Sequence, residues 1–391
     1  MEFSLSDEQQ MIRDTAAAFL AEVSDSAAVR QAMATEAGYL PETWQRLCAE
    51  MYWQAILVPE EFGGLGLGYV ELAVVLEQMG ARLLCAPFFS TVCLGVNALL
   101  VAGDNAQKAQ YLPAIAEGSL TATLAYTGPA GRWDLDAVSA TWRRDGDDYV
   151  LDGDYRYVPD GHTADLIIVA AREAGSSGAA GISLFAVPAD SAGLSRSWLP
   201  TMDQTRKQAS LQVQALRLPA TARMGAEAQA GAALQKIIQL AQIGIAAEQM
   251  GGARAVLDQA VAYTRERVQF GRSIASFQAI KHKAADMMLK AEVSLSAVYY
   301  AACVAQEALF GAASIAAELP EAASMAKAYC SDTYFFNAGN ALQMHGGVGF
   351  TWEYDVHLYF KRAKSTETFL GTGAYHRERI ASLLLDGEDA A

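Results

Sequence analysis

The feature that most constrains the fold is a change in the spacing of apolar residues, from a helical period to alternation and back. Residues 1–118 carry long runs of Ala, Leu, Glu and Gln interrupted by Gly and Pro, which is typical of helices. Between residues 119 and 222, apolar and polar residues alternate as in half-buried strands. The helical period returns over residues 223–391. The sequence therefore predicts an α+β fold with an N-terminal all-α domain, a middle β-domain and a C-terminal helical bundle.

Within the middle zone, four segments are expected to form strands, namely residues 137–142, 148–151, 166–169 and 182–187. Turn-forming sequences such as Asp145-Gly146-Asp147-Asp148 separate these segments. The spacing predicts a small β-barrel or sandwich.

Three long apolar segments follow, near residues 229–267, 276–311 and 320–345, with little sequence between them. Helices of this length joined by short connections predict a bundle. A bundle with this much apolar surface is expected to oligomerise.

The charge balance excludes some classes of partner. The chain has a net charge of −15 at pH 7 and a pI of about 4.8. Such a field would repel the phosphates of a nucleic acid and the surface of an anionic membrane. An acidic protein still binds an anionic cofactor where Arg side chains and backbone N–H groups cluster locally. We therefore expect neither a nucleic acid nor a membrane as partner, whereas a nucleotide cofactor remains compatible.

The compartment is predicted from the cysteines and from the N-terminal sequence. Five cysteines, with no CxxC pair and no metal-like spacing, are expected to be reduced and mostly buried, and they predict no metal site. The first 20 residues carry early acidic residues and no basic region, unlike a signal peptide. No run reaches the roughly 18 uncharged apolar residues that a membrane span requires. These features predict a cytoplasmic protein.

Two clusters in the last zone combine residues that suit a pyrophosphate. The first is residues 265–274, where a helix is expected to end near Gly271, followed by Phe277-Gln278. The second is residues 343–350, whose paired glycines let backbone N–H groups approach an oxygen-rich ligand. Each cluster alone is typical of a helix stop. Together, an Arg that can fork onto phosphate, a Gln and a Gly-Gly pair predict a pyrophosphate clamp.

The pattern RxxFG, then FQ, then QxxGGxGF, on an α-β-α chain of 391 residues, resembles the acyl-CoA dehydrogenase family. Residues 58–64 and 107–113 also match familiar family stretches, so the resemblance covers essentially the whole chain. It implies a C-terminal four-helix bundle in a tetramer, FAD as cofactor and an acyl-CoA as substrate. It also implies electron-transfer flavoprotein as the acceptor of the electrons.

By the same resemblance, FAD lies between the β-domain of one subunit and the helices of a neighbour. Six residues of this chain would hold the ADP half of a FAD that belongs to an adjacent subunit: Arg267, Phe270, Gln278, Gln343, Gly346 and Gly347. The flavin ring would lie near residues 124–131 and 157–159, which include Tyr126, Thr127, Tyr157 and Val158, with Thr372 also near the cofactor. Tyr157 stands in the place of the family's usual Trp and could cover a flavin face.

The resemblance breaks at the general base. The family removes the α-proton of the thioester with a Glu at one of two positions, while the β-hydrogen leaves as a hydride to the flavin. One position, in the motif usually written YEGT, is Leu370 here. The other, 26 residues before Arg267, is Ala241, and the Arg that often follows it is Gln242. Both usual positions therefore lack a carboxylate.

Two nearby acids are candidate substitutes. Glu248 lies seven residues beyond Ala241, about 10 Å along a helix, which is too far for proton transfer over about 3 Å. Glu367 lies three residues before Leu370, but acids occur there in active relatives as well. We therefore expect a structural or solvated role for Glu367 and keep it only as a weak candidate.

The flavin side departs from the family pattern too, whereas the ADP clamp does not. The familiar Trp-Ile-Thr becomes Tyr157-Val158-Pro159, and Pro159 has neither a hydroxyl nor a backbone N–H to offer the flavin. This one-sided loss resembles the heteromeric acyl-CoA dehydrogenases of bacterial steroid catabolism. In those α2β2 assemblies, one subunit supplies the base and its partner lacks it.

The leading hypothesis is therefore a base-lacking subunit that contributes Arg267 and Gln343 to a FAD whose flavin and Glu belong to a partner. Three alternatives remain open. The chain could form a complete homotetrameric dehydrogenase with a non-standard base such as Glu367. It could be a flavin oxidase or monooxygenase on the same fold, or a structural subunit without flavin. The sequence does not indicate which acyl group is used.

Overall fold

The computed structural model describes residues 5–312 and 314–386, which fall into two compact units. The helical unit combines Met1–Arg30, Tyr69–Leu84 and Gln242–Ala391. The sheet unit combines Gln31–Gly68 and Cys85–Ala241. Helices, then strands, then helices follow one another along the chain, which confirms the predicted α+β fold. The domain boundaries placed after residues 118 and 222 stay predictions.

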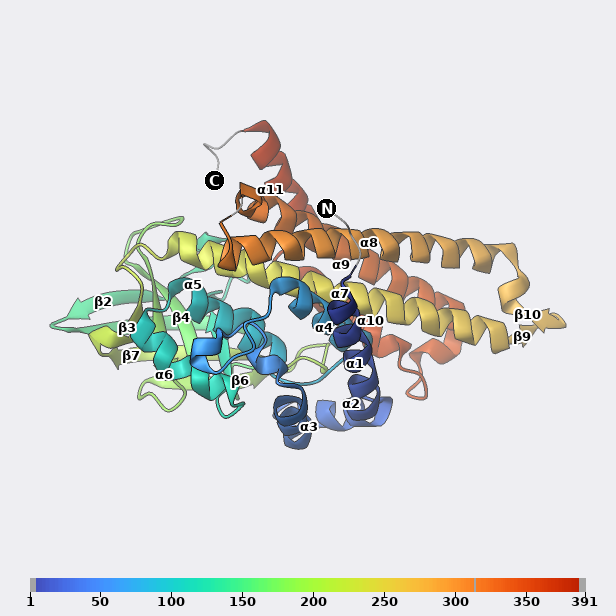
Figure 1. Ribbon diagram of the computed structural model, residues 1–391, viewed down its shortest axis with the longest axis horizontal. Coiled ribbons are helices and arrows are strands. Elements are labelled where there is room, and N and C mark those ends of the chain that lie inside the picture. The colour runs from blue at the N-terminus through green and yellow to red at the C-terminus, as the bar shows by residue number, and fades with distance from the viewer. Residues whose placement is uncertain (1–4, 313, 387–391) are drawn as a thin grey trace. The chain divides into compact units, whose positions relative to one another are not determined.

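Three long helices dominate the helical unit: α7 (Gly231–Glu266), α8 (Gln278–Phe310) and α9 (Leu319–His345). These bounds lie within two residues of the predicted ones. Figure 1 shows the three helices running side by side. Buried Asn337 of α9 joins them, because its Nδ2 donates to the carbonyl of Ala253 on α7 at 3.1 Å and to that of Met287 on α8 at 3.2 Å. The predicted bundle is therefore confirmed.

Shorter elements complete the helical unit. α2 continues into the sheet unit, and the first eleven residues of α7 belong to that unit. The shorter elements are α1 (Asp7–Val23), α2 (Ser26–Ala34), α4 (Tyr69–Ala81), β9 (Val268–Gln269), β10 (Arg272–Ser273), η7 (Ile274–Ser276), η8 (Ser314–Glu318), η9 (Gly346–Phe350), α10 (Val356–Thr368) and α11 (Gly373–Leu385).

The sheet unit is built on strands paired in the order β6-β7-β3-β2-β4-β5-β8, with β1 added beside β4. β4 pairs in parallel with β1 and β2, and the other pairs are antiparallel. The strands are β1 (Ala122–Ala125), β2 (Thr141–Asp145), β3 (Asp148–Pro159), β4 (Leu166–Glu173), β5 (Ile182–Pro188), β6 (Leu194–Leu199), β7 (Gln208–Leu218) and β8 (Arg223–Met224). The helical segments are α3 (Pro41–Arg46), η1 (Leu47–Met51), η2 (Trp53–Ala55), η3 (Glu60–Phe62), η4 (Phe89–Val96), α5 (Asn97–Ala102), α6 (Asn105–Ala116), η5 (Leu135–Ala137) and η6 (Ala220–Ala222).

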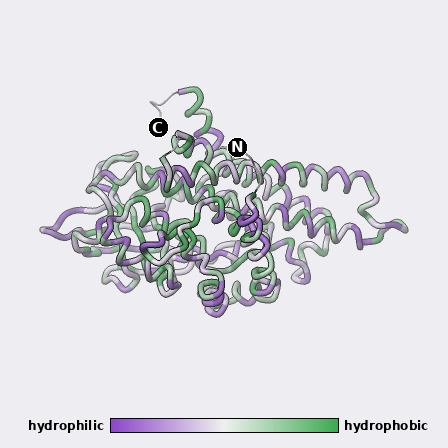
Figure 2. The backbone as a smooth tube through the Cα atoms, in the orientation of Figure 1, coloured by the Kyte–Doolittle hydropathy of each residue, from purple (hydrophilic) through white to green (hydrophobic). Residues whose placement is uncertain are grey.

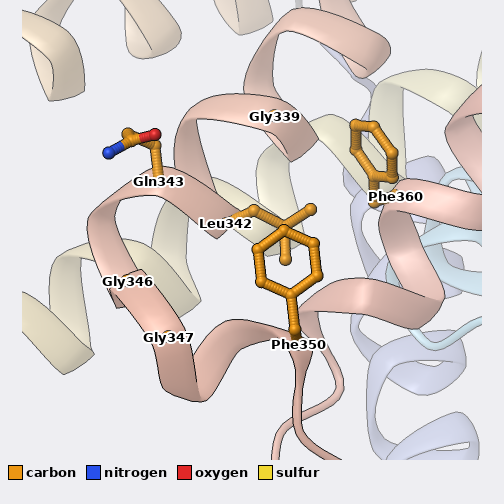
Figure 3. Close-up of a pocket in the computed structure, with 7 residues that line it drawn as sticks. All are labelled: Gly339, Leu342, Gln343, Gly346, Gly347, Phe350 and Phe360. Atoms are coloured by element: carbon orange, nitrogen blue, oxygen red, sulfur yellow. The ribbon is translucent and has the colours of Figure 1, made fainter.

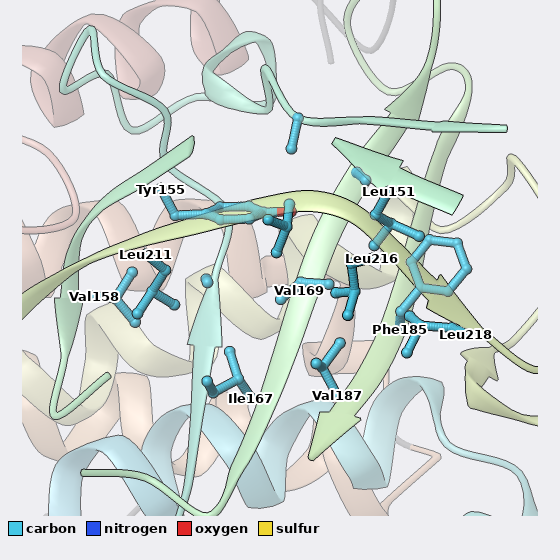
Figure 4. Packing of buried hydrophobic residues seen from close by; sticks show 14 of the residues in the cluster. Leu151, Tyr155, Val158, Ile167, Val169, Phe185, Val187, Leu211, Leu216 and Leu218 are labelled. Atoms are coloured by element: carbon cyan, nitrogen blue, oxygen red, sulfur yellow. The ribbon is translucent and has the colours of Figure 1, made fainter. Parts of the chain in front are cut away.

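One apolar cluster fills the space between these strands, as Figure 4 shows. Leu151, Tyr155, Val169 and Phe185 are each no more than 1% exposed. Tyr155 keeps its one polar atom satisfied, because its hydroxyl donates to the carbonyl of Ala170 at 3.1 Å. Each fully buried side chain of this size contributes about 1.5–3 kcal/mol, so this cluster holds the strands in register.

The strand predicted over residues 137–142 is wrong in its first half. Residues 135–137 form a single helical turn, and β2 begins only at Thr141. The reason is buried Arg172, whose guanidinium donates to the carbonyls of Leu135 at 2.8 Å and Val138 at 2.6 Å. Those carbonyls are therefore used by a side chain and not by a neighbouring strand.

Two predictions apply to the end of α7, residue 267 from the apolar spacing and a point near Gly271 from the glycine. The helix ends at Glu266, so the prediction near Gly271 is wrong. β9 and β10 follow it as a hairpin in which Gln269 pairs with Arg272. The two residues between them, Phe270 and Gly271, have φ angles of 54° and 76°. Two consecutive positive φ values are what a tight two-residue hairpin requires, so the motif turns the chain where a continued helix was expected.

By length and composition α8 could cross a membrane, the only such helix within residues 5–312 and 314–386. A single helix of this kind is weak evidence, and 39% of its apolar window is buried inside the structure. Figure 2 shows apolar and polar residues interleaved along the long helices.

The cysteines are all unpaired, as expected: Cys48, Cys85, Cys93 and Cys330 are buried, and Cys303 is partly exposed.

Candidate functional site

Leu370 lies in the turn of residues 369–372 that joins α10 to α11. Its side chain is 1% exposed and its φ angle is 59°, a left-handed conformation that is unusual for Leu. Gln242, which follows Ala241 on α7, donates from Nε2 to the Leu370 carbonyl at 3.2 Å. The residue beside one usual base position therefore contacts the turn that carries the other, and neither offers a carboxylate.

The two candidate substitute acids are both held by cations. Glu367 Oε2 lies 2.7 Å from Lys364 Nζ, on the partly exposed side of α10. Glu248 Oε2 lies 3.5 Å from Arg362 Nη1, and both side chains are less than 8% exposed. Each carboxylate therefore already has a cationic partner within this chain.

Three of the six predicted ADP-binding residues line one cavity at the C-terminal end of α9. Gln343, Gly346 and Gly347 surround a hollow of about 420 Å³, with Phe350 at its edge (Figure 3). The remaining lining residues are Gly339, Leu342 and Phe360. A second hollow of about 560 Å³ shares Gly339 and Gln343 with the first. Residues of α9 line both hollows.

The other three predicted residues gather around the hairpin after α7. Arg267 and Gln278 are exposed, and Phe270 is 91% exposed at the hairpin tip. The Phe270 ring meets Phe277 edge to face at 6.2 Å between ring centroids, and the Arg272 guanidinium lies 4.0 Å from the centroid of Phe277. None of these residues lines the two hollows described above. The structure thus places the six residues in two groups.

The ends of α7 and α9 nevertheless lie beside each other. The Tyr263 ring on α7 stacks on the His345 ring on α9, with centroids 4.3 Å apart and planes at 18°. Tyr354, in the loop after η9, meets Tyr263 edge to face at 5.8 Å. Burial lowers the pKa of His345, which keeps this ring neutral near pH 7. The stack fixes the helix end that presents Gly346.

In the sheet unit, the structure brings together three of the four predicted flavin-side residues. Thr127 Oγ1 donates to the carbonyl of Arg156 at 2.6 Å, which ties the end of β1 to β3 beside Tyr157. Trp133 bridges the aromatic pair, with its ring 6.3 Å from Tyr126 and 6.5 Å from Tyr157. Tyr157 has a φ angle of 59°. Sequence reasoning missed Trp133, although a Trp in a Gly-rich loop is a signal that could have identified it.

Two predicted flavin-side residues, Val158 and Thr372, do not belong to this group of Tyr126, Thr127 and Tyr157. Val158 is 1% exposed and belongs to the apolar cluster, so its side chain packs in the core of the sheet unit. Thr372 caps α11, because its Oγ1 accepts a hydrogen bond from the Tyr375 N–H at 3.2 Å. The Pro159 carbonyl accepts from Thr123 Oγ1 at 2.7 Å, which fixes the end of β3 without providing a donor.

Comparisons with known proteins indicate one protein family along nearly the whole chain. Family models described as the N-terminal, middle and C-terminal domains of acyl-CoA dehydrogenase match residues 6–119, 123–214 and 230–385. Acyl-CoA dehydrogenase IpdE2 of Mycolicibacterium smegmatis is 33% identical over 368 residues, which cover 94% of this chain and 96% of that protein.

Two solved structures are similar in both sequence and fold. Butyryl-CoA dehydrogenase from Megasphaera elsdenii is 27% identical with a TM-score of 0.88, over 98% of this chain and 100% of that chain. A variant of the Tcur3481-Tcur3483 steroid ACAD is 27% identical with a TM-score of 0.86, over 98% of this chain and 99% of that chain.

Proposed function

We propose that this chain, which belongs to the acyl-CoA dehydrogenase family, is the subunit of a heteromeric enzyme that lacks the general base. The family oxidises an acyl-CoA thioester to its α,β-unsaturated product. The single observation that carries the proposal is that neither usual base position holds a carboxylate. Leu370 occupies one, and Ala241 followed by Gln242 occupies the other, with the Gln242 amide engaged at the Leu370 carbonyl.

Removal of the α-proton requires a base about 3 Å from it in a dry pocket. Leu370 and Ala241 have no atom that accepts a proton. The carboxylate of Glu248 lies against Arg362, and that of Glu367, a lining residue of the second hollow, lies against Lys364. We therefore assign the base to a partner chain of the same family.

The clamp residues fit the ADP half of FAD. Gly347 has no crowded neighbour that a Cβ would touch and does not require a positive φ, so the chain's own packing does not explain this glycine. A ligand that approaches the backbone N–H groups closely does explain it. Arg267 is exposed and makes no ion pair within residues 5–312 and 314–386, which leaves its guanidinium for a phosphate.

FAD, when bound, would accept the β-hydrogen of the substrate as a hydride. In this chain Arg267 would bind a phosphate, Gln343 would hydrogen-bond the ADP half, and the backbone at Gly346 and Gly347 would bind oxygen atoms of the same group. Because the six clamp residues fall into two exposed groups, they suit a cofactor that belongs to an adjacent subunit. On the sheet unit, Tyr157 would cover a flavin face.

The assembly we propose is a tetramer of this chain and a related subunit that bears the Glu. The substrate class we propose is a bulky acyl-CoA, because a steroid acyl-CoA dehydrogenase is among the similar structures. Electron-transfer flavoprotein is the acceptor we propose, on the family resemblance. The cytoplasmic location stays a prediction.

The test is to purify the chain alone and measure its flavin absorbance, its FAD stoichiometry and its native mass. We expect less than one FAD per chain and no bleaching of the flavin by any acyl-CoA. Co-expression with a partner that bears the Glu should restore both. In that complex, replacement of the partner's Glu by Gln should abolish turnover, whereas Glu367→Gln in this chain should leave it within about twofold.

The opposite pattern would support a complete enzyme. A tetramer of this chain alone, with one FAD per subunit and full bleaching by an acyl-CoA, would overturn the proposal. If Glu367→Gln then abolished turnover, Glu367 would be the substitute base.

A further inference from the structure

One glycine inside α9 is not explained by the packing of the chain. Gly339 lies in the interior of the helix, where glycine is less favourable than alanine because it loses more backbone freedom on folding. Apart from the backbone of its own helix, a Cβ at this position would meet one atom of the described residues within 4 Å, Cε2 of Phe360 at 3.9 Å. There is therefore room for a side chain. Gly339 lines both hollows, so its missing side chain leaves a surface that a ligand can approach.

The residues that line the two hollows follow one side of α9. Phe336, Gly339, Asn340 and Gln343 are separated by the intervals of three and four residues that place side chains on the same side of a helix. Gly346 lies at the helix end, beyond Gln343 (Figure 3). The hollows of about 420 and 560 Å³ share Gly339 and Gln343, so they adjoin each other. Each volume lies within the range of about 300–1,000 Å³ that is typical of small-molecule sites.

The two hollows differ in chemistry. In the first, Gly346 and Gly347 leave the backbone open, which suits the close approach of phosphate oxygen atoms. The second is lined by two aromatic rings, Phe335 and Phe336, and by the amide of Asn340. Phe336 is 37% exposed, so part of its side chain is open to a ligand. Because a base stacks on an aromatic ring and pairs with an amide, the second hollow suits the base of a nucleotide and the first its phosphates.

The amides in these hollows favour adenine among the bases. Oδ1 of Asn340 accepts from Lys283 Nζ at 2.8 Å, and Nδ2 donates to the Phe336 carbonyl at 3.0 Å. Each of these two amide atoms can make one further hydrogen bond. The side-chain amide of Gln343 makes no hydrogen bond within residues 5–312 and 314–386, so its donor and its acceptor are both available. An amide pairs with N6 and N7 of adenine, whereas guanine presents two acceptors at the same edge.

The groups that suit the base and the phosphates all belong to this chain. We propose that the two hollows form one adenine-nucleotide site that binds free ADP, so that ADP competes with FAD for this chain. The base would lie in the second hollow and the diphosphate at Gly346 and Gly347. The proposal rests on the proposed function, which assigns the ADP half of FAD to this chain and the flavin to a partner. It adds a second ligand, whose concentration would regulate how much FAD the assembly holds.

The first arm of the test titrates nucleotides into the purified full chain, free of FAD, by calorimetry. ADP should bind at one site per chain with a Kd below about 100 µM. AMP, which lacks the second phosphate, and GDP, which carries the other purine, should each bind at least about tenfold more weakly. FMN, which corresponds to the flavin half of the cofactor, should show no saturable binding below about 1 mM.

Two variants test whether the hollows are the site. Gly339→Leu should weaken ADP binding at least about tenfold, because its side chain would fill space that both hollows share. Leu favours a helix more than Gly does, so this variant should keep its fold. Ala18→Leu, at an exposed position of α1 that lines neither hollow, is the matched control and should stay within about twofold. Phe336→Ala, which removes a stacking surface, should lower the affinity for ADP about tenfold as well.

The second arm measures competition in the assembled enzyme. FAD is titrated into the FAD-free assembly of this chain with its Glu-bearing partner, and flavin fluorescence reports its binding. ADP at about ten times its Kd should raise the apparent Kd for FAD about tenfold, as competition for one site requires. GDP at the same concentration is the control and should raise it no more than about twofold.

The outcomes separate this proposal from the proposed function. A folded chain that shows no saturable ADP binding would overturn the nucleotide site and leave the base-lacking assignment standing. Undiminished ADP binding in both Gly339→Leu and Phe336→Ala would overturn the placement of the site in the hollows, and equal binding of GDP would overturn the choice of adenine. A chain that alone forms a tetramer whose FAD is bleached by an acyl-CoA would refute the proposed function, whereas ADP would still bind at these hollows.

Discussion

At the scale of single residues, the sequence shows that the usual base is missing at Leu370 more readily than it shows which side chains contact that position. Leu370 was identified by its motif, because a pattern of neighbours within the chain defines that position. Lys327 and His376 were not singled out, since one lysine in an Ala-rich helix and one histidine near a C-terminus carry no signal of burial. Lys327 on α9 donates from Nζ to the Gly371 carbonyl at 2.8 Å, and His376 Nε2 on α11 lies 3.0 Å from the Leu370 carbonyl. These contacts follow from the packing of α9 against α10 and α11, which no local pattern encodes.

The histidine makes acid stability a test at this scale. Burial lowers the pKa of His376 from 6.5 to about 3, and Lys327 adds to the effect. Between these values the unfolded chain binds more protons than the folded one, so the free energy of unfolding falls as the pH decreases from 6.5 towards 3, by up to about 1.4 kcal/mol per pH unit. We expect His376→Gln, which keeps a donor for Leu370, to remove that slope.

Denaturant unfolding at pH 7 and pH 4.5 measures the effect. From the higher to the lower pH, the stability of the variant relative to the parent should rise by about 2 kcal/mol. His282→Gln, at an exposed site on α8, is the control and should show no such change. Parallel curves for the parent and His376→Gln would mean that the ring is charged when buried.

At the scale of elements, the helical periods predicted α7, α8 and α9 closely, whereas two boundaries were wrong for local reasons. β2 starts late because Arg172 takes the carbonyls of Leu135 and Val138. The helix before the hairpin ends early because Phe270 and Gly271 turn the chain. A Phe at a positive φ is a rare choice for such a turn, so its sequence did not look like a hairpin.

The exposed Phe270 gives the prediction at this scale. Because its side chain is 91% exposed, Phe270→Ala should change the free energy of unfolding by less than about 0.5 kcal/mol. The affinity of the assembled enzyme for FAD should fall about tenfold, as for a central contact of an interface. Denaturant unfolding and FAD titration measure the two effects.

Tyr52→Ala is the matched control. Tyr52 is also an aromatic residue at a positive φ, 56°, and is 53% exposed in the sheet unit. It should change neither quantity beyond the same limits. A Phe270→Ala variant that lost stability but kept its FAD would contradict the assignment of this hairpin to the clamp.

At the scale of the whole molecule, the overall charge and the local charge have opposite signs. The chain carries −15, yet between residues 265 and 283 a single acid, Glu266, stands among five cations: Arg265, Arg267, Arg272, Lys281 and Lys283. Composition alone excluded nucleic acids and could not locate this patch. The RxxFG motif marks the position of the patch. In the structure, the five cations lie at the end of α7, in the hairpin and at the start of α8.

Salt should therefore weaken the binding of FAD. Screening lengths fall from about 10 Å at 0.1 M to about 3 Å at 1 M, so the Kd of the assembled enzyme for FAD should rise about tenfold between 0.05 and 0.5 M salt. Arg267→Gln should raise the Kd and flatten this dependence. Arg46→Gln, which removes a partly exposed Arg that pairs with Glu50 in the sheet unit, should leave the dependence unchanged.

The interleaving of the two units has a consequence for biosynthesis. The sheet unit ends at Ala241, while the helical unit needs α1 and α4 from early in the chain and everything after Gln242. α4 contacts α1, which is made before it, and α8, which is made long after it. At about 5–20 residues per second, α4 waits roughly tens of seconds on the ribosome before α8 emerges. Leu72, Val75 and Leu76 are buried in the finished protein, and we expect them to be more exposed to water during that interval. We therefore expect the nascent chain to offer an apolar binding site to chaperones until the later helices are made.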